Sequence, residues 1–295
     1  MTRSLRAFLV APQDRRDLLL GRRDFRFSPK RSLPRPSGKS EKVDSIVEDA
    51  LRAEDFYLLV GPPGTGKTNL AMRTMVDNFL ADPGCRILLM AYTNRAVDEI
   101  CRMLCQYDPT LDYIRIGNEL NCEPAFRPHL LKYEMEACAN RSAVVQRLSQ
   151  CRVFVATAAS MDGKATLFDL IRFDVAIVDE ASQILEPQLL GTLCATTETG
   201  EPAIRKFVMI GDHKQLPAVV QQSRDASEID KPELRAIGLE NCADSLFERL
   251  HRHMTAHSEV KPGMLDTQWR MHPTISEFVS RYFYNNALLA GGNAT

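Results

Sequence analysis

The sequence lacks long hydrophobic runs and paired cysteines. No apolar stretch approaches the ~18 residues that a membrane-spanning helix needs, and the N-terminus has no small-residue cleavage site of a secretory signal. The eight cysteines stand singly without a CxxC pair, which argues against the common zinc and dithiol motifs. These absences predict an intracellular protein without membrane contact, cytoplasmic in a bacterium and with a nuclear location open in a eukaryote.

Net charge is also low, at −1, but it is unevenly distributed. Residues 1–40 hold eleven Lys or Arg and three Asp, so the rest of the chain is acidic. The basic start could contact phosphate backbones or form a solvated linker, and the Pro, Ser and Gly of RSLPRPSGKS leave both interpretations open. We expect residues 1–38 to be a basic segment or linker, with a domain boundary near Gly38.

Five short apolar runs predict buried strands, at residues 56–60, 86–93, 152–159, 173–180 and 206–212. Amphipathic helical patterns lie between most of them, so the chain alternates β and α. This alternation predicts an α/β fold over residues 39–262: a doubly wound parallel sheet with helices on both faces. The polar stretch 118–150 predicts a small helical insertion. In such sheets ligands bind beyond the carboxyl ends of the strands.

A phosphate-binding segment follows the first predicted strand. It matches the pattern GxxxxGK[ST] of P-loop NTPases and precedes a helical stretch, which is the context that this pattern requires. We expect backbone amides to surround the phosphates of ATP, Lys67 to reach the β- and γ-phosphates, and Thr68 to ligate Mg²⁺. The predicted cofactor site comprises Gly61, Pro62, Pro63, Gly64, Thr65, Gly66, Lys67 and Thr68.

Asp179 and Glu180 end the apolar run that spans residues 173–180. Alone, such a pair could equally cap the next helix, but with a P-loop upstream it predicts phosphoryl-transfer chemistry. Asp179 would hold Mg²⁺ together with Thr68, and Glu180 would orient the attacking water. We therefore expect the turn at 61–68 and this acidic pair to lie on the same edge of the sheet.

Six segments resemble, in order and spacing, the motif series of superfamily 1 helicases: GPPGTGKT, AYTNRAVDEI, VATAAS, VDEASQ, GDHKQLPAVV and TQWRMHP. The series looks most like superfamily 1B, the branch of the nonsense-mediated-decay RNA helicase and the Okazaki-fragment nuclease–helicase. The resemblance covers roughly residues 40–290. It implies a RecA-like domain, with residues 263–295 as the start of a second RecA-like domain that is cut short and that full activity requires.

The resemblance also implies roles for individual residues. Gln215 would contact the γ-phosphate, Arg270 would be directed at the same phosphate, and Trp269 would stack on adenine, with a core anchor as the other interpretation of Trp269. Where family members carry an adenine-reading glutamine, this chain has Val43, so adenine specificity stays open. Four residues correspond to contacts with the nucleic-acid backbone: Thr93, Asn94, Thr157 and Ser160.

The resulting hypothesis is an ATP-dependent motor that moves along single-stranded DNA or RNA, by resemblance from 5′ to 3′. A nucleotide-binding scaffold with little turnover is the alternative. A AAA-type ATPase shares GPPGTGKT, but GDHKQLP and QWRMHP favour the helicase. The sequence has neither the NKxD motif of GTPases nor the LSGGQ-type signature of ABC transporters.

Overall fold

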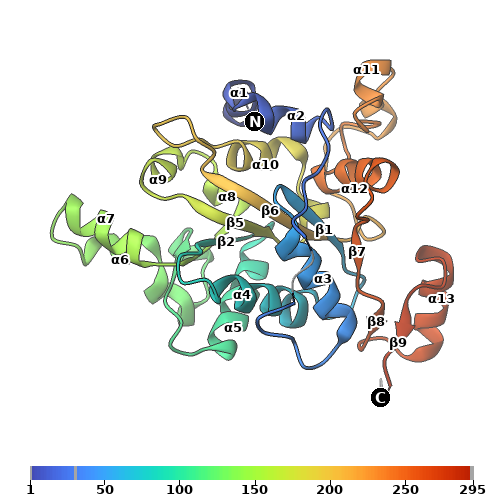
Figure 1. Cartoon of the computed structure of the whole chain (residues 1–295), viewed down its shortest axis with the longest axis horizontal. Helices are drawn as coiled ribbons and strands as arrows, with labels where there is room; N and C mark the ends of the chain where they lie inside the picture. The colour runs from blue at the N-terminus through green and yellow to red at the C-terminus, as the bar shows by residue number, and fades with distance from the viewer. Residues whose placement is uncertain (1, 30–31, 293–295) are drawn as a thin grey trace.

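The fold is built on one parallel sheet of seven strands, seen in a computed structural model that describes residues 2–29 and 32–292 (Figure 1). The strand order is β3-β4-β2-β5-β6-β1-β7, and every neighbouring pair is parallel. The predicted α/β sheet is confirmed. Its strands are β1 (Phe56–Val60), β2 (Ile87–Ala91), β3 (Tyr113–Ile116), β4 (Val153–Thr157), β5 (Phe173–Val178), β6 (Ile204–Gly211) and β7 (Gly263–Met264).

Helices cover both faces of this sheet, so its strands are apolar on both sides. One face carries α3 (Glu41–Arg52), α4 (Arg73–Leu80) and α5 (Asn94–Tyr107). The other carries α1 (Thr2–Val10), α2 (Gln13–Leu19), α8 (Ala158–Met161), α9 (Ala165–Leu170), α10 (Glu186–Leu193) and α12 (Leu246–His257). No helix among the described residues is long and apolar enough to cross a membrane.

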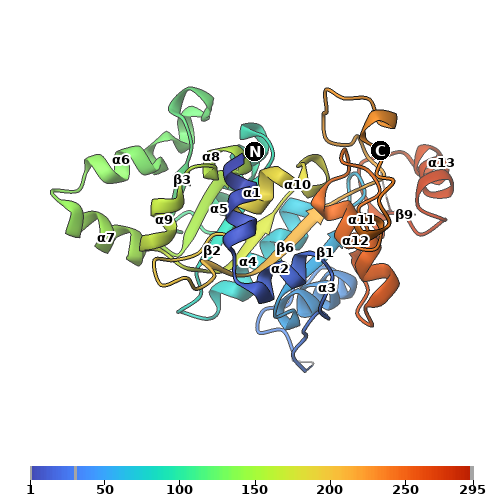
Figure 2. The ribbon, with the colours of Figure 1, turned by 90° about the horizontal axis from the view of Figure 1, so that it is seen from above.

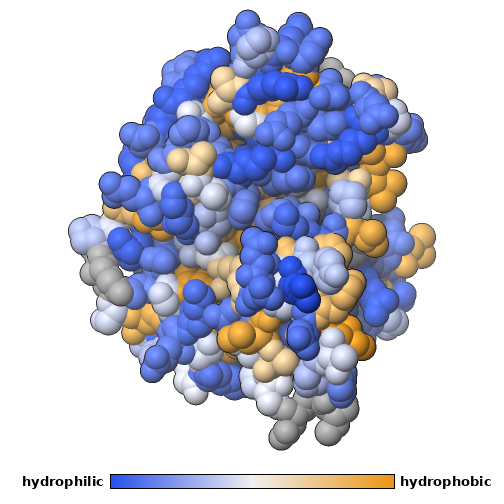
Figure 3. Space-filling model, turned by 90° about the vertical axis from the view of Figure 1, so that its right-hand side faces the viewer, coloured by the Kyte–Doolittle hydropathy of each residue, from blue (hydrophilic) through white to orange (hydrophobic). Residues whose placement is uncertain are grey.

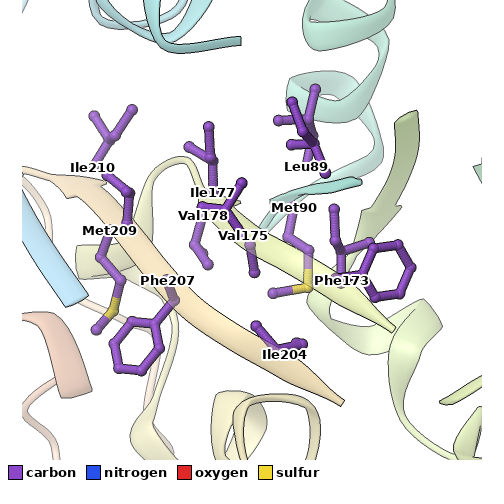
Figure 4. Packing of buried hydrophobic residues seen from close by; sticks show 14 of the residues in the cluster. Leu89, Met90, Phe173, Val175, Ile177, Val178, Ile204, Phe207, Met209 and Ile210 are labelled. Atoms are coloured by element: carbon purple, nitrogen blue, oxygen red, sulfur yellow. The ribbon is translucent and has the colours of Figure 1, made fainter. Parts of the chain in front are cut away.

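The core lies between the central strands and their helices. Figure 4 shows side chains of β2, β5 and β6 packed together, and Leu89, Ile177 and Met209 among them are fully buried. Apolar area removed from water stabilises the fold by about 25 cal/mol per Å². The strand ends that carry the polar motifs are therefore fixed by close packing.

The N-terminal residues, which we expected to form a basic segment or linker, pack on this core. Leu18 and Leu19 of α2 are buried in the main core cluster. Arg15, also buried, donates hydrogen bonds to the carbonyl oxygens of Ile204 (2.5 Å) and Arg205 (2.9 Å). Arg15 thus finds its acceptors on β6. Residues 1, 30 and 31 of the expected linker lie outside the described residues.

The insertion expected at 118–150 is helical and follows β3 at one end of the sheet. It contains η2 (Glu119–Asn121), η3 (Pro124–His129), α6 (Leu131–Glu136) and α7 (Arg141–Gln150). In Figure 2, α6 and α7 lie at the opposite end of the molecule from α13 (Pro273–Phe283). The connection between β6 and α12 contains η5 (Asp225–Ser227) and α11 (Pro232–Arg235).

The C-terminal residues divide differently from the expected boundary at 263. Strand β7 pairs with β1, so residues 263–264 belong to the first sheet. The following strands β8 (Thr267–Gln268) and β9 (Leu289–Ala290) form a separate two-stranded sheet that packs with α13. We call residues 267–290 the C-terminal unit. Residues 293–295 lie outside the described part of the chain.

Candidate nucleotide-binding site

The turn at residues 61–68 leaves β1 at the carboxyl edge of the sheet. Its start is tied to β6, because the Gly61 amide donates to the Gly211 carbonyl oxygen at 2.9 Å. Gly64 and Gly66 have φ values of 75° and 82°, in the left-handed region that residues with a Cβ rarely adopt. The helix that follows begins as a π-helical turn, η1 (Lys67–Met72), and continues as α4. This geometry directs a helix N-terminus toward the concave side of the turn, as anion binding requires.

The acidic pair lies directly beside this turn. The Thr68 hydroxyl donates to Oδ2 of Asp179 at 2.8 Å, and Lys67 Nζ lies 3.1 Å from Oε1 of Glu180. Glu180 has a φ of 51°, which is unusual for a residue with a side chain. This left-handed backbone accompanies a turn in chain direction after β5. The structure therefore brings together two adjacent residues of the P-loop and two adjacent acidic residues that lie more than 100 residues further along the chain.

Asp179 is nearly fully buried, at 3% exposure. Burial and the adjacent Glu180 charge raise the pKa of Asp179 to about 6, against the hydrogen bond from Thr68. A carboxylate in this environment gains from a nearby cation. The Thr68 hydroxyl and the Asp179 carboxylate are both oxygen ligands of the kind that Mg²⁺ prefers.

The residues at this point fit a metal ion that is bound partly by substrate. Among the described residues, no cluster of three or more His, Cys, Asp or Glu side chains could hold a metal ion. Mg²⁺ usually keeps several waters and binds through one or two protein oxygens together with substrate phosphates. The donor set of Thr68 and Asp179 matches that arrangement.

Gln215 is held by the residue that follows β6. Its Nε2 donates to Oδ2 of Asp212 at 2.7 Å, and Asp212 is completely buried. The Asp212 amide in turn donates to the Ser182 hydroxyl at 3.0 Å, which ties this loop to the segment after Glu180. The amide end of Gln215 thus faces an anchored carboxylate.

Arg270 lies against the P-loop because Gly64 has no side chain. A Cβ built at Gly64 would lie 2.6 Å from Cβ of Arg270, closer than van der Waals contact allows. The neighbouring Trp269 amide donates to the Gly64 carbonyl oxygen at 3.0 Å. Gln268, which is fully buried, accepts hydrogen bonds from the amides of Arg270 (2.9 Å) and Met271 (2.6 Å). These contacts fix the main chain that carries the arginine.

A cavity of about 370 Å³ connects these groups. Its lining includes Glu180, Gln215 and Arg270 together with the P-loop. One face of α5 also lines it, through residues that the sequence analysis did not identify. Their spacing places them on one helix face, but nothing in the sequence shows that this face meets the P-loop; they are Glu99, Arg102, Met103 and Gln106.

Trp269 and Val43 lie apart from this cavity. The Trp269 side chain is 61% exposed and is not among the residues that line the cavity, so it is not a core anchor. Its indole packs against Gly291, where an added Cβ would lie 2.4 Å from the ring. Val43 is buried in the core on α3.

The four residues expected to contact nucleic acid lie at the ends of two adjacent strands, β2 and β4, whose last residues pair. Thr93 caps α5 by accepting a hydrogen bond from the Ala96 amide at 3.2 Å, and Asn94 is the first residue of that helix. Thr157 accepts from the Ser160 amide at 2.9 Å, and the two hydroxyls lie 2.7 Å apart. These residues share the carboxyl edge of the sheet with the P-loop but do not line its cavity.

Comparison with known proteins identifies the family to which the chain belongs. The family model described as an AAA domain matches residues 40–147 and 138–223, and a second model with the same description matches residues 242–295. Among solved structures, the arterivirus nonstructural protein 10 helicase with DNA aligns with a TM-score of 0.48 and 15% identity, covering 86% of this chain and 44% of that chain.

Curated relatives are found over most of the chain. The human DNA replication ATP-dependent helicase/nuclease DNA2 is 32% identical over 260 residues, which is 87% of this chain and 21% of that protein. The helicase/nuclease JHS1 of Arabidopsis thaliana is 32% identical over 241 residues, 82% of this chain and 16% of the relative. The chain thus spans about a fifth of the length of these relatives or less. It belongs to the AAA-domain family of superfamily 1B helicases and forms their RecA-like domain.

Proposed function

We propose that this chain is the ATP-hydrolysing domain of a helicase that moves along single-stranded nucleic acid, in the 5′ to 3′ direction. The observation that carries the proposal is the meeting of two residue pairs beside one cavity, which Lys67, Thr68 and Glu180 line. Thr68 lies 2.8 Å from Asp179, and Lys67 lies 3.1 Å from Glu180. A nucleotide-binding turn, a metal-binding pair and a carboxylate that can orient water are the parts that phosphoryl transfer needs.

The P-loop would bind the phosphates of ATP through its amides and through Lys67. Thr68 and Asp179 would hold Mg²⁺, which neutralises charge that develops on the phosphates. In this structure Lys67 is paired with Glu180. Phosphate would draw Lys67 away from Glu180, because phosphate oxygens are strong acceptors for an ammonium group. Glu180 would then be free to orient the attacking water.

Gln215 and Arg270 would act on the γ-phosphate from the other side of the cavity, which both of them line. An arginine at this position is worth on the order of 10³–10⁵ in rate in related chemistry. Gln215 would leave Asp212 to reach the phosphate. An adenine contact by Trp269 would require its ring to turn away from Gly291.

Nucleic acid would bind at the ends of β2 and β4, through Thr93, Asn94, Thr157 and Ser160. Short hydroxyl and amide groups suit phosphate and sugar oxygens and carry no base code, so binding would not depend on sequence. The relatives are described as DNA replication helicase/nucleases, which favours DNA over RNA.

One observation favours a second candidate, a nucleotide-binding scaffold with little turnover. Val43 is buried in the core and has no polar group to read a base. If base recognition is weak, bound nucleotide could serve assembly instead of movement. The two candidates differ in whether phosphate is released.

The experiment measures phosphate release from ATP with and without single-stranded DNA or RNA, and ATP binding by calorimetry. Glu180→Gln should keep ATP binding while lowering release about 10²–10⁴-fold, the usual contribution of a positioned general base. Lys67→Ala should weaken ATP binding itself. Exposed residues of the α11 region supply matched controls, Lys231→Ala and Glu233→Gln, which should behave as the wild type. Tight ATP binding with no release under any polymer would support the scaffold.

A further inference from the structure

The C-terminal unit touches the Gln215 loop through one buried tyrosine. Tyr284 follows the last residue of α13 and is 7% exposed. Its hydroxyl donates to Oδ2 of Asp212 at 2.5 Å, across 72 residues of sequence. The same oxygen accepts the hydrogen bond from Gln215. Two donors, one from each part of the molecule, therefore share one carboxylate oxygen.

Asp212 is well placed to transmit a change between these donors. Its side chain is fully buried, and its other oxygen accepts from the Lys214 amide at 3.0 Å. All three donors are neutral, so the buried charge depends on hydrogen bonds for its stabilisation. Leaving such a buried acceptor without a donor is unfavourable, because its desolvation is then uncompensated. Loss of the hydrogen bond from either Tyr284 or Gln215 should therefore strengthen the hydrogen bond from the other to Asp212.

Tyr284 is rigidly attached to its own unit. Its amide donates to the Ser280 carbonyl oxygen at 3.0 Å, and its carbonyl accepts from the Ala287 amide at 2.8 Å. Burial raises the pKa of Tyr284 above its ordinary value, and the hydrogen bond to Asp212 raises it further. The hydroxyl therefore keeps its proton at neutral pH and remains a donor.

Elsewhere the C-terminal unit presents much of its surface to solvent. Figure 3 faces this side of the molecule and shows hydrophobic atoms among hydrophilic ones over its lower half. Exposed large side chains on α13 are Ile275, Phe278, Tyr282 and Phe283. A buried, charge-assisted hydrogen bond is therefore a prominent anchor between this unit and the Gln215 loop.

We propose that Tyr284 is a positioning residue that couples the placement of the C-terminal unit to the side chain of Gln215. The coupling rests on one part of the proposed function, namely that Gln215 contacts the γ-phosphate. When Gln215 turns toward the phosphate, Asp212 keeps Tyr284 as the donor to Oδ2, and this bond tightens. When the C-terminal unit moves and Tyr284 no longer donates to Asp212, Gln215 becomes the remaining donor to Oδ2. Gln215 is then held away from the nucleotide. By linkage the effect is reciprocal.

The sole tryptophan reports on this coupling without hydrolysis. Trp269 belongs to the C-terminal unit and is 61% exposed, so acrylamide can quench its fluorescence. Quenching is compared in the presence of Mg²⁺ with ADP or with a non-hydrolysable ATP analogue, which differ in the γ-phosphate. A coupling of 1–3 kcal/mol corresponds to a roughly 5–150-fold preference between the two placements of the unit. We expect the wild type to give different quenching constants with the two nucleotides.

Tyr284→Phe removes the hydroxyl and keeps the ring, and it should abolish this difference. Gln215→Ala should abolish it as well. Tyr282→Phe is the matched control, since Tyr282 lies on the same helix but is 66% exposed. The control should retain the wild-type difference. A role in folding alone would shift quenching equally with both nucleotides.

Calorimetric binding of both nucleotides, measured in parallel, separates the possible failures. If Tyr284→Phe still gives different Trp269 quenching constants with the two nucleotides, the coupling is overturned. It is also overturned if the wild type binds both nucleotides but gives the same quenching constant with each. Neither result affects the proposed hydrolysis. If the wild type binds neither nucleotide, both proposals fall. If Tyr284→Phe does not fold, Gln215→Ala decides the matter, because a difference that persists in that variant overturns the coupling.

Discussion

Arg23→Ala is expected to destabilise the domain by about 2 kcal/mol, through the buried carboxylate of Asp55. Arg23 donates to both oxygens of Asp55, at 2.8 Å and 2.7 Å, and Arg26 donates to Oδ1 at 2.7 Å. The Asp55 side chain is only 3% exposed. Burial opposes its ionisation, but the hydrogen bonds from Arg23 and Arg26 outweigh burial and lower the pKa of Asp55 to about 2.

The magnitude follows from this pKa. An ordinary aspartate titrates near ~3.9, and each pH unit of difference corresponds to ~1.4 kcal/mol. Because the pKa of Asp55 is lower in the folded chain, its contribution is complete above pH ~4 and is lost as the pH falls toward 2. Arg26 remains in the variant, so part of the stabilisation persists.

Urea unfolding at pH 7, and at the lowest pH at which the wild type stays folded, measures this effect. Arg22→Ala is the matched control, because Arg22 is an exposed neighbour of Arg23. We expect Arg23→Ala to lose stability at pH 7 and to approach the wild type at low pH, while the control follows the wild type throughout. An Arg23→Ala variant within 0.5 kcal/mol of the wild type at pH 7, roughly the scatter of surface substitutions, would refute the reasoning.

Three further predictions concern the site. Asp179→Asn should raise the Mg²⁺ concentration needed for half-maximal phosphate release, in a magnesium titration; an unchanged titration would contradict the metal role. Gly64→Ala should push Arg270 away and lower turnover about 10²-fold, the effect of a ~1 Å misplacement, without loss of folding by circular dichroism; wild-type turnover would show that Arg270 is not needed there. Thr157→Val removes the hydroxyl that accepts a hydrogen bond from the Ser160 amide, and it should lower the free energy of unfolding by about 1 kcal/mol. It should also weaken the stimulation of phosphate release by single strands. Stimulation equal to that of the wild type would count against the nucleic-acid surface.

The sheet could be predicted from the sequence where its strands are continuous apolar runs. All five predicted runs contain a strand. Strand β3 was not predicted, because Arg115 interrupts its apolar pattern, although the Arg115 side chain is only 1% exposed. Its charge is compensated by Asp98 on α5, and a hydrophobic pattern does not show such a partner. The N-terminal arginines were assigned to a linker for the same reason, since their acceptors on β6 and at Asp55 are distant in sequence.

Local motifs pointed to candidate residues of the site but not to their contacts. The P-loop and the acidic pair both follow strands of one parallel sheet, so topology was enough to expect them on one edge. The α5 face was not predicted, because Arg102, Met103 and Gln106 lie outside the quoted motifs, and the motif that contains Glu99 does not show that this helix face meets the P-loop. The contact between Tyr284 and Asp212 was equally hidden, since it depends on how a separate unit folds back on the sheet.

Under the proposed function, the left-handed backbone at Glu180 sets fold stability against chemistry at a single residue. A side chain in this conformation costs about 1–2 kcal/mol, which glycine would not incur. Glycine gains more freedom on unfolding, so the net benefit of Glu180→Gly would be at most ~1 kcal/mol. The Glu180→Gly variant would be a more stable domain that has no carboxylate opposite Lys67. It would bind a nucleotide without hydrolysing it. Such a variant would be suited to trapping the loaded state for crystallography.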